Sequence, residues 1–225
     1  MKRIEYLYPY RFTIFFISLL FILFGDLLIP FYTFITYIAP IFFIVNILAG
    51  TLLISKKKKL HRIFIGLFLL TILYILFSSY LVTDEEVYRY IRFAILFSFY
   101  CFVTYEIISQ VWQSSKVDRG VILGLICGYI CLGLVGFFIC LAVEESEPGS
   151  FYGLASFESD PEAYKNSLQY YSFVTLLTIG YGDILPISQL ARKASVLIGL
   201  LGQFYLVIVT AVVIEKYIRD NRKGN

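Results

Sequence analysis

The chain has 225 residues and a formal net charge of +3, and 59% of its residues are hydrophobic. Its mean hydropathy of +0.79 is far too high for a soluble domain of this length, so we expect a membrane protein. The single histidine, His61, leaves almost no material for histidine-based catalysis or metal ligation, and the four cysteines lie in apolar segments without ligand-like neighbours.

Six apolar stretches are each long enough to cross a hydrocarbon layer of about 30 Å as a helix. They are residues 12–29, 31–54, 63–82, 93–111, 121–143 and 194–214. Six crossings place both chain ends on the same side of the membrane. With the termini inside, most of the 19 Lys and Arg residues are cytoplasmic, as the positive-inside rule requires. We therefore expect an all-α, multi-pass plasma-membrane protein with both termini in the cytoplasm.

Two acidic residues interrupt these stretches, Asp26 near the outer end of the first and Glu106 toward the inner end of the fourth. Ionisable groups are costly in lipid and usually find a partner. Arg89 and Arg92 lie three residues apart at the outer end of the fourth stretch, so we expect Asp26 to pair with one of them. For Glu106, the cytoplasmic interface and an inner basic residue are both open.

Between the last two apolar stretches, an amphipathic segment at residues 165–177 leads into Thr178-Ile179-Gly180-Tyr181-Gly182-Asp183. An ion that leaves water needs carbonyl oxygens that all face one axis, whereas a strand points successive carbonyls to opposite sides. Left-handed residues at alternate positions solve this problem, and Gly180 and Gly182 adopt that conformation at little steric cost. The alternative is an ordinary turn between two helices. The flanking helices favour a re-entrant pore loop.

This segment resembles the selectivity filter of the potassium channel family. Residues 120–217 also share the order of that family: outer helix, turret, pore helix, filter and inner helix. The resemblance extends to Glu147-Pro148-Gly149-Ser150-Phe151 and to the inner-helix segment from Gly199 to Tyr205. It implies that four copies of the loop, from Thr178 to Gly182, form the filter. Rings of carbonyl oxygens would bind K⁺ at Thr178, Ile179, Gly180 and Tyr181.

The resemblance also implies residues that support the filter. Thr175 and Thr178 match the paired threonines of the family's pore helix, and Tyr170 and Tyr171 match its aromatic pair. A buried phenol needs a partner, so we expect the Tyr171 hydroxyl to pair with Asp183. Anchoring at the membrane interface is the alternative for the two tyrosines.

Glycines on the last two helices have two interpretations. Gly202 lies where the family has its gating hinge, and Gly199 is a second candidate. A bend and close helix packing explain both glycines equally well. On the outer helix, Gly120, Gly124 and Gly128 repeat every four residues, and packing is the better explanation.

Most acidic residues fall on the outer side, among them Glu144, Asp160 and Glu162. Repeated by fourfold symmetry, an acidic rim raises the local cation concentration. For residues far from the filter, a merely solvated loop is the better interpretation.

The resemblance divides the chain at residue 112. Residues 1–112 form a four-helix module in the place of a voltage sensor, and residues 113–225 form the pore module. A sensor needs about three or four charges on its fourth helix. Here Arg89 and Arg92 are followed by an apolar run, so we expect weak or absent voltage gating.

The sequence thus predicts a homotetrameric potassium-selective channel, with six transmembrane helices per subunit and K⁺ as the permeant ion. It would contact membrane lipid and have no catalytic centre, cofactor or nucleic-acid partner. The alternative is a membrane sensor or assembly protein whose pore is non-conducting or weakly selective. The short stretch after Tyr217 leaves no room for a ligand-binding domain, so the gating stimulus is open among the membrane helices, lipid, pH, tension, the filter and a separate regulatory subunit.

Overall fold

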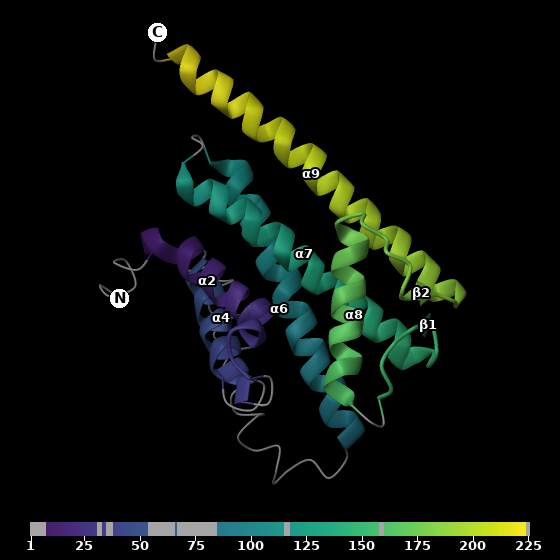
Figure 1. The fold of residues 1–225 in the computed structure, drawn as a ribbon. Helices are drawn as coiled ribbons and strands as arrows, with labels where there is room; N and C mark the ends of the chain where they lie inside the picture. Colours follow the sequence, from purple (N-terminus) through teal and green to yellow (C-terminus); the bar gives the residue numbers. More distant parts are fainter. Residues whose placement is uncertain are drawn as a thin grey trace. The chain divides into compact units, whose positions relative to one another are not determined.

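The computed structural model describes residues 8–30, 33–34, 38–53, 66, 85–114, 118–157 and 160–223, and these are almost entirely helical (Figure 1). The helices are α2 (Arg11–Phe24), α4 (Ala39–Leu53), α6 (Glu85–Gln113), α7 (Arg119–Ser146), α8 (Pro161–Leu176) and α9 (Gln189–Lys223). The 3₁₀ turns η1 (Tyr8–Tyr10) and η2 (Gly25–Leu27) flank α2. The chain divides into two compact units, Met1–Gly128 and Tyr129–Asn225, and the boundary between them falls within the sequence of α7.

Four helical stretches of the described residues are long and apolar enough to cross a membrane. They are Tyr8–Leu27, Phe93–Gln113, Arg119–Ser146 and Gln189–Lys216, and they correspond to the first, fourth, fifth and sixth predicted crossings. The second predicted crossing contains the shorter apolar helix Ile41–Leu53. The third, residues 63–82, lies outside the described residues apart from Gly66. The all-helical membrane character is therefore confirmed, and the number of six crossings stays a prediction.

In the first unit, large side chains fill the space that small residues leave. Phe15 and Leu19 of α2 are fully buried, and α2 and α4 run side by side (Figure 1). A Cβ on Gly50 would meet the Phe99 ring at 2.7 Å, so only a glycine lets α6 approach α4 this closely. A Cβ on Gly124 would similarly meet the Phe12 ring at 2.9 Å, which supports the packing role predicted for this glycine.

A buried polar chain also joins three helices of the first unit. The Asn46 side-chain amide on α4 donates to Ser18 Oγ on α2 at 2.9 Å, and its oxygen accepts from the Tyr100 hydroxyl on α6 at 3.3 Å. Each of these three residues is at most 1% exposed. Polar groups that satisfy one another across helices hold those helices together in a bilayer.

Glu106 on α6 is buried and is linked to a basic residue through a bridging amide. Gln110 Nε2 donates to Glu106 Oε1 at 3.0 Å, and Gln110 Oε1 accepts from Arg11 Nε at 3.3 Å. Gln110 thus connects a carboxylate to a guanidinium, which answers the question that the sequence left open about Glu106. The pairing predicted for Asp26 stays a prediction, because the side chains of Arg89 and Arg92 lie outside the described residues. Asp26 itself lies exposed in η2.

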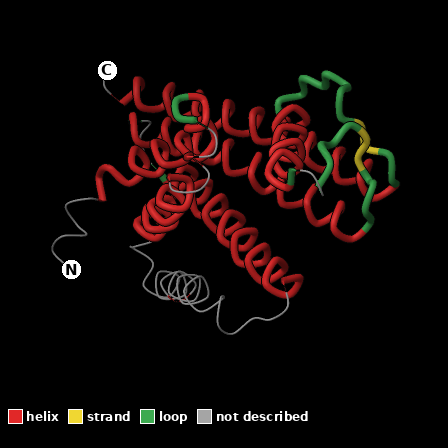
Figure 2. Tube along the Cα trace, turned by 60° about the horizontal axis from the view of Figure 1, so that its bottom comes forward, coloured by secondary structure: helices red, strands yellow, loops and turns green. Residues whose placement is uncertain are grey.

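The second unit contains the latter half of α7, together with α8, α9 and a small sheet. Strands β1 (Phe151–Tyr152) and β2 (Leu185–Pro186) pair antiparallel, with Phe151 opposite Pro186 and Tyr152 opposite Leu185. Figure 2 shows the two strands in yellow between green loops. This sheet joins the segment that follows α7 to the segment that precedes α9.

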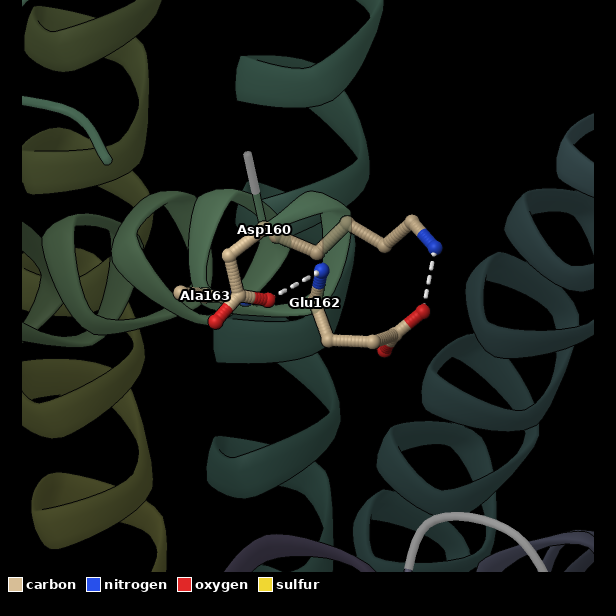
Figure 3. Close-up of polar contacts among 4 residues, drawn as sticks. Asp160, Glu162 and Ala163 are labelled. Atoms are coloured by element: carbon tan, nitrogen blue, oxygen red, sulfur yellow. Dashed lines mark hydrogen bonds and ion pairs between the residues drawn. The ribbon is translucent and has the colours of Figure 1, made fainter. Parts of the chain in front are cut away.

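Helix α8 begins at Pro161, earlier than the predicted start at residue 165, because Asp160 caps it. The Asp160 carboxylate accepts hydrogen bonds from the backbone amides of Glu162 at 3.2 Å and Ala163 at 3.0 Å (Figure 3). Pro at the first helical position already has the required φ and lacks a donor that would need a partner. Lys165 and Glu162 form an ion pair of 2.7 Å on the first turn. Asp160 followed by Pro161 is a helix-start signal in the sequence, and the amphipathic pattern alone did not show this start.

Asp160→Ala is expected to lower the free energy of unfolding by about 1 kcal/mol, because two amides at the start of α8 lose their acceptor. Asp160→Asn keeps a cap and is expected to retain most of the stability. Denaturant unfolding in detergent, followed by circular dichroism, measures both. Glu162→Gln is the control, since loss of its partly exposed ion pair should change stability by less than about 1 kcal/mol. Equal effects of Asp160→Ala and Glu162→Gln would contradict the capping role.

Candidate functional site

The loop that follows α8 has left-handed backbone at alternate positions. The φ angles are 57° at Thr178, 64° at Gly180 and 83° at Gly182. Both glycines therefore have the predicted conformation, whereas the left-handed state of Thr178 was not predicted. This alternation is the backbone pattern that turns successive carbonyl groups toward one side, as a dehydrated cation requires.

The left-handed state of Thr178 follows from the way in which α8 ends. The amide of Thr178 donates to the Thr175 carbonyl at 3.0 Å, and the amide of Ile179 donates to the Val174 carbonyl at 2.9 Å. These two bonds form a Schellman motif, in which the residue after the cap is left-handed and is usually glycine. A threonine there costs roughly 1–2 kcal/mol. The first residue of the loop is thus at once the end of the helix and the start of the alternating segment.

The far end of the loop is held by the small sheet. The amide of Ile187 donates to the Ser150 carbonyl at 2.8 Å, next to the β1–β2 pairing. Gly153, with φ of 89°, brings its Cα so close to the Asp183 carbonyl that a Cβ would collide with it. A glycine is needed at this position both for its φ and for this close approach.

Glu144 corrects the prediction of an outer acidic rim. It is only 5% exposed, and its two carboxylate oxygens accept from the backbone amides of Gly149 at 2.7 Å and Phe151 at 3.1 Å. The carboxylate therefore fastens the end of α7 to the turn that leads into β1. Asp160 likewise serves as a helix cap, so two of the acidic residues assigned to the outer side have structural partners.

The two tyrosines of α8 have separate roles, and the predicted pairing of Tyr171 with Asp183 is wrong. The Tyr171 hydroxyl lies 2.6 Å from Ser195 Oγ on α9. Tyr170 is the residue that faces Asp183, and this hydrogen bond is the largest of the causes that raise the pKa of the Tyr170 hydroxyl. Neighbouring residues on a helix point about 100° apart, so the two hydroxyls reach different elements.

Tyr171 is buried, at 7% exposure, and its ring packs edge-on against Phe151 with centroids 5.0 Å apart. Behind the loop lies a cavity of about 180 Å³ that both tyrosines line together with Val174 and Thr175. These residues lie on the α8 side of the loop, and the role that the resemblance gave to the tyrosine pair stays a prediction. The filter-supporting roles predicted for Thr175 and Asp183 likewise stay predictions.

Close packing explains Gly202. A Cβ at this position would collide with the Leu176 carbonyl at the end of α8, and it would lie 3.0 Å from the Leu176 side chain. The same carbonyl accepts a hydrogen bond from the Tyr129 hydroxyl of α7 at 3.1 Å. Around Gly199, in contrast, a Cβ would meet none of the described atoms within 4 Å. The structure thus supports packing at Gly202, and a hinge at either glycine stays a prediction.

Two further glycines, which sequence analysis missed, let α8 lie directly against α7. A Cβ on Gly133 would collide with the Phe173 ring, and a Cβ on Gly136 would approach Ser172 Oγ to 2.5 Å. Ser172 Oγ donates to the Gly133 carbonyl at 2.8 Å. The signal in the sequence was a pair of small residues three apart on α7, the spacing of one helix face.

The loop itself is open on the side away from α8. The residues from Leu177 to Asp183 are all exposed, with Tyr181 at 71%. The described residues contain no group of three or more His, Cys, Asp or Glu that could hold a metal ion. Besides the side-chain oxygens of Thr178 and Asp183, this loop offers backbone oxygens to a cation.

Residues 124–219 match the family described as ion channel. The match covers most of α7, all of α8, the loop with alternating left-handed residues and most of α9, which is less than half of the chain. It agrees with the predicted resemblance at the level of ion channels, and that family is not one of enzymes. No curated protein and no solved structure matches the chain. The match and the apolar helices together support an ion channel in a membrane.

Glu144→Gln is expected to lower the free energy of unfolding by about 1–3 kcal/mol, because glutamine offers one acceptor oxygen to two backbone amides, of which that of Phe151 is buried. The measurement is the unfolding midpoint in detergent, together with the rate of proteolysis between α7 and α8. Glu147→Gln on the same turn is the matched control, since this side chain is exposed. A Glu144 variant as stable as the Glu147 variant would contradict the role assigned to the carboxylate.

Proposed function

We propose that four copies of this chain form a potassium-selective channel in the plasma membrane, with K⁺ passing through the backbone oxygens of Thr178 to Gly182. The alternating left-handed backbone at Thr178, Gly180 and Gly182 is the observation that carries the proposal. The match of the surrounding residues to the ion channel family supports it. A turn between two helices needs no such alternation over three positions.

A single chain offers one side of an ion path, which is why the proposal needs several copies. The loop residues are exposed toward the side that α8 does not cover, and α9 exposes many large apolar side chains, including Val196, Leu200, Phe204 and Val207. Four loops around an axis would surround a dehydrated ion with rings of oxygens. Neighbouring copies and lipid would cover the apolar face of α9.

The end of α8 adds an electrostatic contribution. Its last carbonyl groups carry the partial negative charge of the helix dipole, and Thr178 follows them directly. A cation near the inner end of the loop is therefore favoured. This contribution requires no acidic side chain, and Val174 faces the cavity behind the loop.

Voltage dependence is expected to be weak, because Arg89 and Arg92 are followed on α6 by apolar residues. Both termini would lie in the cytoplasm, following the distribution of Lys and Arg. The stimulus that opens the pore would act through the membrane helices, lipid or a separate regulatory subunit. A sensor or assembly protein with a non-conducting pore is the alternative that a flux experiment separates from a channel.

Purified protein in liposomes is expected to pass K⁺ much faster than Na⁺, since carbonyl rings of the proposed kind replace the hydration shell of K⁺. Ion flux is measured under opposite K⁺ and Na⁺ gradients, and planar-bilayer recording with stepped voltage then measures gating. The protein mass of the particle in detergent, after subtraction of the bound detergent, should equal four chains of 26.0 kDa. Equal passage of the two ions, or no flux from a tetramer, would contradict the proposal.

Gly180→Ala is expected to abolish selective K⁺ flux, because a left-handed alanine costs about 1–2 kcal/mol and the cost recurs in each of four subunits. Gly149→Ala is a matched control. Its φ is 82°, and, as at Gly180, a Cβ meets no described atom within 4 Å, but it lies on the turn before β1. Gly149→Ala introduces the same strain of a left-handed alanine outside the proposed filter, so K⁺ flux should persist. Similar loss in both variants would show that strain alone, and not the filter, explains the effect.

A further inference from the structure

The hydrogen bond between Tyr171 and Ser195 has a fixed direction. Ser195 Oγ donates to the Ala191 carbonyl at 2.7 Å, one turn earlier on α9. A serine hydroxyl has one proton, so Ser195 has none left for Tyr171. The Tyr171 hydroxyl must therefore be the donor in the 2.6 Å contact with Ser195 Oγ.

The connection continues from Tyr171 toward the loop along α8. Thr175 lies one turn after Tyr171 on the same face of α8. The Thr175 backbone carbonyl accepts the amide of Thr178, the first left-handed residue of the loop, at 3.0 Å. The Ser195–Tyr171 bond and the last turn of α8, at Thr175, thus connect the inner helix to the first residue of the loop.

The surroundings of Tyr171 make its hydrogen bond to Ser195 sensitive to the separation of α8 and α9. The residue is 7% exposed, and the Phe151 ring covers it. A hydroxyl at a largely buried site is disfavoured when it loses its acceptor. A hydrogen bond of this kind also weakens steeply with distance and angle.

We propose that Ser195 is a positioning residue for the filter, which it holds in the conducting conformation through Tyr171 and Thr175. The inference rests on the proposed function, because it assigns the filter to residues 178–182. Its consequence is that a displacement of α9 near Ser195 changes the filter, so the inner helix and the filter respond together.

The test compares Ser195→Ala with Ser195→Thr in the full-length protein in planar bilayers. Ser195→Ala removes the acceptor for Tyr171 and is expected to lower the ratio of K⁺ to Na⁺ permeability by about twofold to tenfold, the size of one hydrogen bond. Ser195→Thr keeps the hydroxyl and should restore the wild-type ratio. Tyr171→Phe should match Ser195→Ala, and the double variant should be no worse than either single variant, because both remove the same bond.

Ser167→Ala is the matched control. Ser167 Oγ donates to the Ala163 carbonyl on its own helix at 2.8 Å, as Ser195 does to Ala191, but this bond lies in the first half of α8. Its loss should leave the permeability ratio unchanged. A Ser195→Ala protein with lower thermal stability and an unchanged ratio would overturn the positioning role.

A second measurement separates this inference from the proposed function. Amide hydrogen exchange across residues 177–183 needs no ion flux, and it should be faster in Ser195→Ala and Tyr171→Phe than in wild type, Ser195→Thr and Ser167→Ala. Unchanged exchange in a conducting protein overturns the role of Ser195 alone. Faster exchange in a protein without K⁺ selectivity supports the path to the loop and overturns the proposed channel.

Discussion

The Schellman motif at the end of α8 is the constraint on which the second unit depends. Two amides, those of Thr178 and Ile179, bond back to the helix and force Thr178 into a left-handed conformation. Gly180 and Gly182 continue the alternation that this residue begins. A helix end that normally uses glycine here uses threonine. The energetic cost of that choice must be offset by the contacts that hold the loop.

Those contacts come from three directions. At the outer end, Glu144 and the β1–β2 pairing fasten the loop to the end of α7. From the side, Tyr171 links α8 to α9 through Ser195. At the inner end, Gly202 lies against the Leu176 carbonyl, so that no side chain separates α8 from α9. The loop is exposed in one chain, yet its backbone is held at both ends and from one side.

The sequence predicted the parts of this arrangement that depend on local chemistry. The alternating glycines required left-handed residues, and the apolar runs required helices of membrane length. The role of Glu144 and the partners of the two tyrosines depend on neighbours in three dimensions, and the sequence did not predict them correctly. Glu144 bonds to backbone amides, which have no residue signature, so it looked like an external charge. Tyr170 and Tyr171 differ by one position, and spacing alone did not show which of them turns toward Asp183 and which toward α9.

The link between α7 and α8 is fastened at its beginning, by Glu144 to the end of α7 and by β1 and Gly153 to the segment after the loop. Among the described residues 154–157, none adds a backbone hydrogen bond of this kind. Changes of length or composition in this stretch therefore leave the backbone of the loop in place, so this is where the second unit tolerates variation.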